Sequence, residues 1–280
     1  MDIIEKIINS SEEDIDKIVE EEIQRQDNLA HKIEQLGFIN ENIKDSSFKG
    51  FIPLKTRIKY SNFAIETYSM ETTDYIYSFA HFMKQHDIKD KASIIHYLEY
   101  FIDDYFGPYQ NQSREKIFND IAWHSTTTDE EYFKALENNK LGDLKGTGAA
   151  ECTERSALAE QILSVLGFDT YYCIGNYQDS NGRSEAHAFN VVNVKNGYVI
   201  VDYSLPIYSY NKEGEKKARY PFIGKMTEEE FNNFINNGII KTFNNYKYED
   251  GKVVMLDSDR SYKTTNNKLE INEEQGKQKF

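Results

Sequence analysis

The chain has 280 residues, of which 39% are hydrophobic and 14% aromatic, enough to bury the core of one large or two small domains. Its 33 basic and 47 acidic residues give a formal charge of -14, which disfavours nucleic acid and anionic membrane surfaces as partners. Only two cysteines occur, Cys152 and Cys173, which argues against a disulfide framework and favours a reducing compartment.

Neither the N-terminus nor any later segment contains the apolar run that a signal peptide or a membrane span requires. We therefore expect a soluble, cytoplasmic protein without membrane association, although export that needs no signal would leave no mark in the sequence. The histidines and cysteines do not follow metal-ligand spacing, and no acidic calcium-binding loop occurs. We expect neither a metal nor another cofactor.

The first half of the chain is predicted to be mainly helical. Apolar residues at helical spacing predict a long amphipathic helix over about Ser10–Gly37. Four further segments begin near a capping residue and repeat apolar side chains every three to four positions: Thr73–His86, Lys91–Tyr105, Ser113–Trp123 and Thr128–Asn138. The stretch Phe38–Glu71 is irregular, and short strands there are one option.

A helix followed by strands is predicted next. The glycine-rich loop Leu141–Ala150 leads into a helix over Glu151–Leu166, and Gly167 stands where a left-handed helix end belongs. Three strands follow: Phe168–Tyr177, Glu185–Val194 and Tyr198–Tyr203. Asn196-Gly197 is predicted to be the turn between the last two.

The pattern loosens after Pro206. It predicts a helix near Thr227–Asn236 and a last hairpin that turns at Asp250-Gly251. From Ser258 the chain is polar, and we expect it to be flexible. The expected organisation is thus a helical region over residues 1–120, an α+β core over residues 121–257 and a flexible tail over residues 258–280.

Cys152 is the first candidate functional residue because it falls in the first turn of a predicted helix, directly after the glycine-rich loop. The positive end of a helix stabilises a thiolate, which is the nucleophilic form of cysteine. The alternative is a small buried side chain that happens to begin a helix. Cys173 falls in the middle of a strand, where we expect a buried, unreactive thiol.

His187 and Asp202 each interrupt an otherwise apolar strand. A buried acid needs a partner, and a histidine across the hairpin would supply one, although His187 could also be an ordinary core residue. If Asn196-Gly197 is a two-residue turn, Val191 faces Asp202 and His187 shares their sheet face. His187 then lies four residues, about 13 Å, from Val191, so that strand twist, a bulge or a looser turn must close the gap.

The segment over residues 146–206 resembles the core of the transglutaminase-like superfamily, which has a papain-like Cys-His-Asp arrangement. The matching motifs are Cys152, Leu166-Gly167, Gly175-Asn176-Tyr177, His187-Ala188-Phe189-Asn190 and Asp202. Phe189 stands where the family usually has tryptophan, and Tyr203 where it has proline. The resemblance implies a nucleophile helix packed on an antiparallel sheet, with the offset in the hairpin accommodated.

The resemblance also implies a reaction. His187 would take the proton of Cys152, the thiolate would attack an amide or ester carbonyl, and Asp202 would orient the histidine. The backbone N–H of Cys152 is one candidate donor to the oxyanion. Relatives take a second donor from upstream of the cysteine, often a tryptophan, which here implies Trp123; an ordinary core aromatic is the alternative for this residue.

Three interpretations of function follow. We expect a hydrolase of the peptidase, amidase or deamidase type that acts on a protein or peptide substrate. A crosslinking transglutaminase or another amine acyltransferase is the first alternative, and an inactive binding or scaffold domain is the second. The acidic N-terminal helices could cover the cleft, present substrate or bind a partner. The sequence leaves the oligomeric state open.

Overall fold

The computed structural model describes residues 2–35, 42–43, 47–59, 67–110, 112–113, 116, 140–210, 212–249 and 252–264. Its helices are α1 (Ile3–Asn9), α2 (Glu12–Gln35), α3 (Asp74–Gln85), α4 (Lys91–Phe106), α7 (Cys152–Val165) and α8 (Glu228–Asn237). The short strands are β1 (Asn42–Ile43), β2 (Phe48–Lys49), β3 (Arg57–Lys59) and β4 (Thr67–Ser69). The long strands are β5 (Thr170–Gln178), β6 (Ser184–Val194), β7 (Gly197–Tyr210), β8 (Lys216–Met226), β9 (Lys241–Glu249) and β10 (Lys252–Thr264).

The helical predictions for the first half are confirmed where the structure describes them. α2, α3 and α4 match the three predicted segments to within a few residues, and the short helix α1, capped by the Asp2 side chain, precedes them. β1, β3 and β4 form a small sheet in the stretch that had been left open. Most of Ser113–Trp123, all of Thr128–Asn138 and the expected boundary near residue 120 fall outside the described residues.

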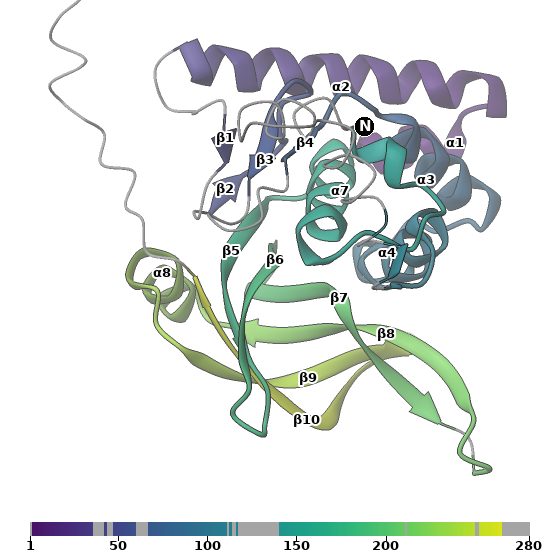
Figure 1. The fold of residues 1–280 in the computed structure, drawn as a ribbon. Coiled ribbons are helices and arrows are strands. Elements are labelled where there is room, and N and C mark those ends of the chain that lie inside the picture. Colours follow the sequence, from purple (N-terminus) through teal and green to yellow (C-terminus); the bar gives the residue numbers. More distant parts are fainter. Residues whose placement is uncertain are drawn as a thin grey trace, which may run out of the picture.

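The second half is an antiparallel sheet with the strand order β8-β7-β6-β5-β10-β9, and β2 pairs with β5 outside this path. The sheet curls, so that β8 and β9 approach one another (Figure 1). The backbone N–H of Ile223 on β8 donates to Asn245 Oδ1 on β9 at 3.0 Å. The fold class is therefore a mixture of helices and a curled antiparallel sheet, as the α+β prediction requires.

α7 lies at the centre, between the N-terminal helices and one face of the sheet (Figure 1). Every residue from Thr153 to Val165 is buried, whereas the sequence had indicated a single apolar face. Apolar side chains such as Leu158 and Ile162 pack into this core. A second core lies on the opposite face of the sheet, where Phe231 and Phe234 of α8 cover the strands.

Two segments are more regular than the sequence indicated. β7 continues through Pro206 to Tyr210, and the break in its pairing with β8 between Asp202 and Ile207 accommodates a proline that has no N–H to donate. β10 continues to Thr264, although the chain was expected to be flexible from Ser258. The polar composition of this segment does not indicate a strand. The strand forms because it pairs with its neighbours β5 and β9.

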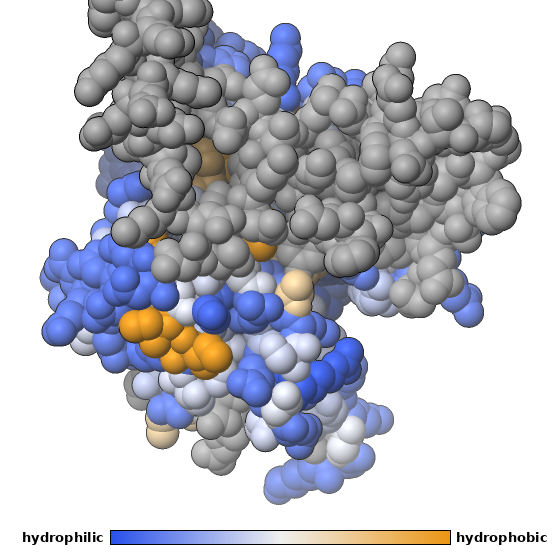
Figure 2. All heavy atoms as spheres, turned by 60° about the vertical axis from the view of Figure 1, so that its left-hand side comes forward, coloured by the Kyte–Doolittle hydropathy of each residue, from blue (hydrophilic) through white to orange (hydrophobic). Residues whose placement is uncertain are grey.

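The face of the molecule in Figure 2 is mainly hydrophilic where residues are coloured, and its hydrophobic surface is confined to small patches. Within the described ranges, no helix combines the length and the apolar character needed to cross a bilayer. In the same part of the chain, no group of three or more His, Cys, Asp or Glu side chains could hold a metal ion.

Candidate active site

The loop before α7 is fastened to the end of α4. The backbone N–H of Gly146 donates to the Tyr105 carbonyl at 2.8 Å, and that of Gly148 donates to the Phe106 carbonyl at 2.7 Å. Gly148 has a φ of 70°, and a Cβ at this position would lie 2.6 Å from the Pro108 carbonyl oxygen. Only glycine fits at this position. The loop leads directly to Cys152, which is the first residue of α7, as predicted, and is partly buried.

The register of the β6–β7 hairpin corrects the sequence-based expectation. The turn consists of residues 195 and 196, and Gly197 pairs with Val194, so that Val191 faces Ile200 rather than Asp202. Gly197 has a φ of 134°, and a Cβ there would lie 2.3 Å from the Met226 carbonyl oxygen, so this glycine serves the approach of β8.

The corrected register removes the awkward offset. The pairing of Asn190 with Val201, extended by one residue, places Asp202 opposite Phe189. Phe189 is two positions from His187 on the same strand. Diagonal neighbours on one face of an antiparallel pair lie within reach of long side chains. His187 Nε2 lies 2.8 Å from Asp202 Oδ2, and the two side chains are 3% and 0% exposed.

The Cys152 thiol lies on the same cleft as the His187 ring and close enough to raise the pKa of the imidazole. Because Nε2 faces Asp202, the ring nitrogen left for the thiol is Nδ1. The structure therefore brings together three of the four predicted site residues. Trp123, the tentative oxyanion donor, lies outside the described residues.

The charges on His187 and Asp202 support one another. Burial alone lowers the pKa of His187, but the Asp202 carboxylate and the Cys152 thiol together raise this pKa to about 10. Burial alone would raise the pKa of Asp202, but His187, Arg260 and Ser204 hold it well below its usual range. A positively charged imidazole is thus held beside the cleft into which Cys152 opens.

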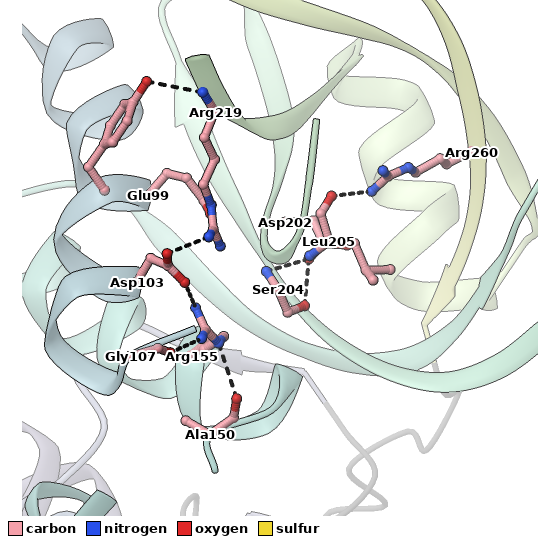
Figure 3. A network of polar contacts seen from close by, with 11 residues as sticks. Glu99, Asp103, Gly107, Ala150, Arg155, Asp202, Ser204, Leu205, Arg219 and Arg260 are labelled. Carbon is pink, nitrogen blue, oxygen red and sulfur yellow. Dashed lines mark hydrogen bonds and ion pairs between the residues drawn. The ribbon is translucent and has the colours of Figure 1, made fainter. Parts of the chain in front are cut away.

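Asp202 is surrounded by donors that sequence reasoning missed. Its Oδ1 accepts from the Ser204 N–H at 3.0 Å, the Ser204 hydroxyl at 2.7 Å and the Leu205 N–H at 3.2 Å. Figure 3 shows Ser204 and Leu205 folded back on Asp202, with Arg260 reaching the Leu205 carbonyl. The order Asp-x-Ser could have indicated the local turn. Its Oδ2 also accepts from the Tyr262 hydroxyl at 2.7 Å, and nothing local to the site motifs indicates this residue.

Arg155 connects the start of α7 to its surroundings. Its side chain is almost fully buried, with Nε donating to the Ala150 carbonyl at 3.1 Å and Nη2 to the Gly107 carbonyl at 2.9 Å. Nη1 lies 3.3 Å from Asp103 Oδ1 on α4. Figure 3 shows Arg155 between α4 with the residue that follows it, Gly107, and Ala150 in the loop that precedes Cys152. Arg155 was not predicted from the sequence.

Asp103 is shared with a second arginine, Arg219 of β8, at 2.5 Å. Arg219 also contacts Glu99 Oε1 at 2.5 Å, and the chain of charges continues from α7 to β8 (Figure 3). Burial raises the pKa of Glu99 to about 8 even though Arg219 opposes this shift.

α7 is fixed on the sheet by buried polar contacts one turn beyond the cysteine. Asn190 Nδ2 on β6 donates to the Ser156 carbonyl at 3.0 Å and to Glu160 Oε2 at 2.9 Å. Thr170 Oγ1 on β5 donates to the same Glu160 oxygen at 3.0 Å. Burial raises the pKa of Glu160 well above its usual value, although the hydrogen bonds from Asn190 and Thr170 oppose this shift. These bonds set the position of Cys152 relative to His187.

A cleft of about 540 Å³ opens over Cys152 and His187. Asp202 is not among its lining residues and lies behind the histidine. The walls come from three places, the end of α4, the start of β6 and the middle of β7, and include Pro108, Tyr109, Arg183, Glu185, Pro206 and Tyr208. The cleft also reaches Asp103, Arg155 and Arg219, so the charged network forms part of its floor.

The two cysteines differ in environment, as expected. Cys173 is fully buried on β5, and burial raises the pKa of its thiol to about 12. Cys152 opens into the cleft next to a cationic histidine. Of the two thiols, Cys152 alone is placed for chemistry with an external reagent.

The site therefore contains a thiol and an imidazole on one cleft, with a carboxylate bound to the imidazole behind it. These groups occur in the order Cys152, His187 and Asp202, on a helix and two neighbouring strands. No protein-family model matches the chain, and no curated protein is significantly similar to it, so sequence comparison assigns it to no family.

Proposed function

We propose that this chain is a cysteine-dependent acyl-transfer enzyme with a papain-like, transglutaminase-like core that acts on an amide or peptide bond. The observation that carries the proposal is the position of His187, which contacts Asp202 and lines the same cleft as the Cys152 thiol. Support also comes from the cleft above both reactive side chains. A scaffold protein has no need of this combination.

The first half-reaction would form a thioester. His187 takes the proton of Cys152, and the thiolate attacks the carbonyl carbon of the substrate. The backbone N–H of Cys152, at the beginning of α7, has no acceptor within the helix and is available to the oxyanion. As the carbon–nitrogen bond breaks, His187 returns the proton to the departing amine.

We propose water as the acceptor in the second half-reaction, with a protein or peptide as substrate. His187 takes a proton from water, the resulting hydroxide attacks the thioester, and the carbon–sulfur bond breaks. The products are a carboxylic acid, which loses its proton to solvent, and the Cys152 thiolate, which with the protonated His187 re-forms the pair that attacked the substrate. The volume of the cleft is in the range of sites that hold a small ligand or a few residues of a peptide.

The activated thiol can be tested with iodoacetamide at about pH 6, where an ordinary thiol is almost entirely protonated. Mass spectrometry locates the label, and Cys173 is an internal control because it is fully buried. We expect rapid labelling of Cys152 that falls at least about tenfold in His187→Ala. Slow labelling of Cys152 that does not depend on His187 would contradict the proposal and favour an inactive binding domain.

The acceptor needs a separate experiment. β-Casein is incubated with the wild-type chain and with Cys152→Ala, in the presence of dansylcadaverine. Chain cleavage or ammonia release without incorporation of the fluorescent amine, lost in Cys152→Ala, would support hydrolysis. If the wild-type chain incorporates the fluorescent amine and Cys152→Ala does not, the acceptor is an amine, and the proposal of water as acceptor is wrong.

A further inference from the structure

Tyr262 contacts the centre of the site from a distant part of the chain. It lies on β10, is 0% exposed, and donates its hydroxyl to Asp202 Oδ2 at 2.7 Å. The same oxygen faces His187 Nε2 at 2.8 Å. Two donors from different strands thus converge on one carboxylate oxygen.

The two oxygens of Asp202 are held in different ways. Oδ1 is held by Ser204 and Leu205, which follow Asp202 directly in the chain. Among the described residues, Oδ2 contacts His187 and accepts a hydrogen bond from Tyr262. The direction in which Oδ2 faces the histidine therefore depends on Tyr262 as well as on the donors to Oδ1.

β10 also holds the segment that follows Asp202. Arg260 Nη1 donates to the Leu205 carbonyl at 2.5 Å, and its charge helps to keep Asp202 ionised. β10 itself is held in place by its pairing with β5, where Tyr262 faces Tyr177. The strand therefore supports Asp202 directly through Tyr262 and indirectly through Leu205.

We propose that Tyr262 is a positioning residue for the Cys-His-Asp site. Its hydroxyl orients Asp202 Oδ2 toward His187 and stabilises the buried negative charge, because a hydrogen bond to a charged acceptor is stronger than one to a neutral acceptor. The inference rests on the proposed function.

The alternative is that Tyr262 is only a core aromatic. Its ring lies 5.1 Å from that of Phe189 and 5.4 Å from that of Phe222, measured between centroids. Tyr262→Phe keeps these ring contacts and removes only the hydroxyl. Tyr203→Phe is a matched control, because Tyr203 is equally buried and adjacent to Asp202 in the chain but donates to the Ile95 carbonyl.

The test measures the rate constant for iodoacetamide alkylation of Cys152 at about pH 6. We expect Tyr262→Phe to lower this rate about tenfold, and Tyr203→Phe to change it by less than about twofold. Asp202→Asn removes the charge that Tyr262 supports. Adding Tyr262→Phe to Asp202→Asn should therefore lower the rate no further. If Tyr262 only supported the core, its replacement would lower the rate by a similar factor in the wild-type chain and in Asp202→Asn.

A second measurement reports on His187 directly. The proton between His187 Nε2 and Asp202 Oδ2 should give a downfield ¹H resonance that moves in Tyr262→Phe and not in Tyr203→Phe. Wild-type alkylation and an unmoved resonance in Tyr262→Phe would overturn the inference, as would an equal loss of rate in both backgrounds. Failure of the proposed function is distinct, because wild-type labelling would then be independent of His187 before any tyrosine is changed.

Discussion

Replacing Arg155 with methionine should show how much of the site depends on the buried contacts behind it. Methionine keeps the aliphatic part of the side chain but removes three polar contacts, to the Ala150 carbonyl, the Gly107 carbonyl and Asp103. The two carbonyls lose a charged donor inside the protein, where such bonds contribute most.

The magnitude follows from what remains. Removing one partner of a buried ion pair costs about 3–5 kcal/mol when the other charge is left alone. Asp103 keeps its contact with Arg219 at 2.5 Å, so the lower end applies. We expect Arg155→Met to lower the free energy of unfolding by about 3 kcal/mol. We also expect slower alkylation of Cys152, because the loop anchored through Ala150 lies just before it.

Urea unfolding followed by circular dichroism measures the stability, and iodoacetamide labelling measures the thiol. Arg183→Met is the matched control: Arg183 lines the same cleft, but its side chain is 77% exposed and its contact with Glu185 is 3.4 Å. It should change the free energy of unfolding by less than about 0.5 kcal/mol. Equal stabilities of the two variants, with wild-type labelling in both, would refute the role assigned to Arg155.

Three further changes test other parts of the fold. Glu160→Gln should stabilise the chain increasingly as the pH rises above 4.5, because the raised pKa of the buried carboxyl makes ionisation unfavourable in the folded state; equal pH profiles in urea unfolding would contradict this. Gly175→Ala should lower both the melting temperature and the rate at which Cys152 is labelled. A Cβ at this position would lie 1.7 Å from the Lys263 carbonyl oxygen and would push β10 away from β5. An unchanged melting temperature would contradict this packing. The stabilisation of the wild-type chain over Asp202→Asn should be complete between pH 3.8 and 6.5, because the pKa of Asp202 is lowered from 3.8 and that of His187 is raised from 6.5. It should disappear as the pH rises through about 10, where His187 loses its proton, and a difference that persists in alkali would show that His187 is not the titrating partner.

Local signals in the sequence were sufficient for four of the described helices, and they singled out the three polar residues that the structure brings together. α2, α3, α4 and α7 repeat apolar side chains at helical spacing, and Gly167 follows the end of α7. Cys152 after a glycine-rich loop, and His187 and Asp202 on apolar strands, stand out because such residues are costly to bury without partners.

The hairpin shows where local reasoning was insufficient. The Asn196-Gly197 pair is a common turn signal, yet the turn lies one residue earlier because Gly197 is needed where β8 approaches. That shift of register, decided by a neighbouring strand, brings Asp202 two residues closer to the position opposite His187.

By itself the sequence determined which segments are helical, that Cys152 begins a helix, and that a histidine and an acid lie on adjacent strands, because these depend on neighbours within a few residues. The tertiary structure decided the register of the hairpin, the long strand β10 and the contacts of Arg155 and Tyr262. Tyr262 lies 60 residues beyond Asp202, in a stretch too polar to be recognised as a strand, and only the pairing of β10 with β5 brings its hydroxyl to the carboxylate.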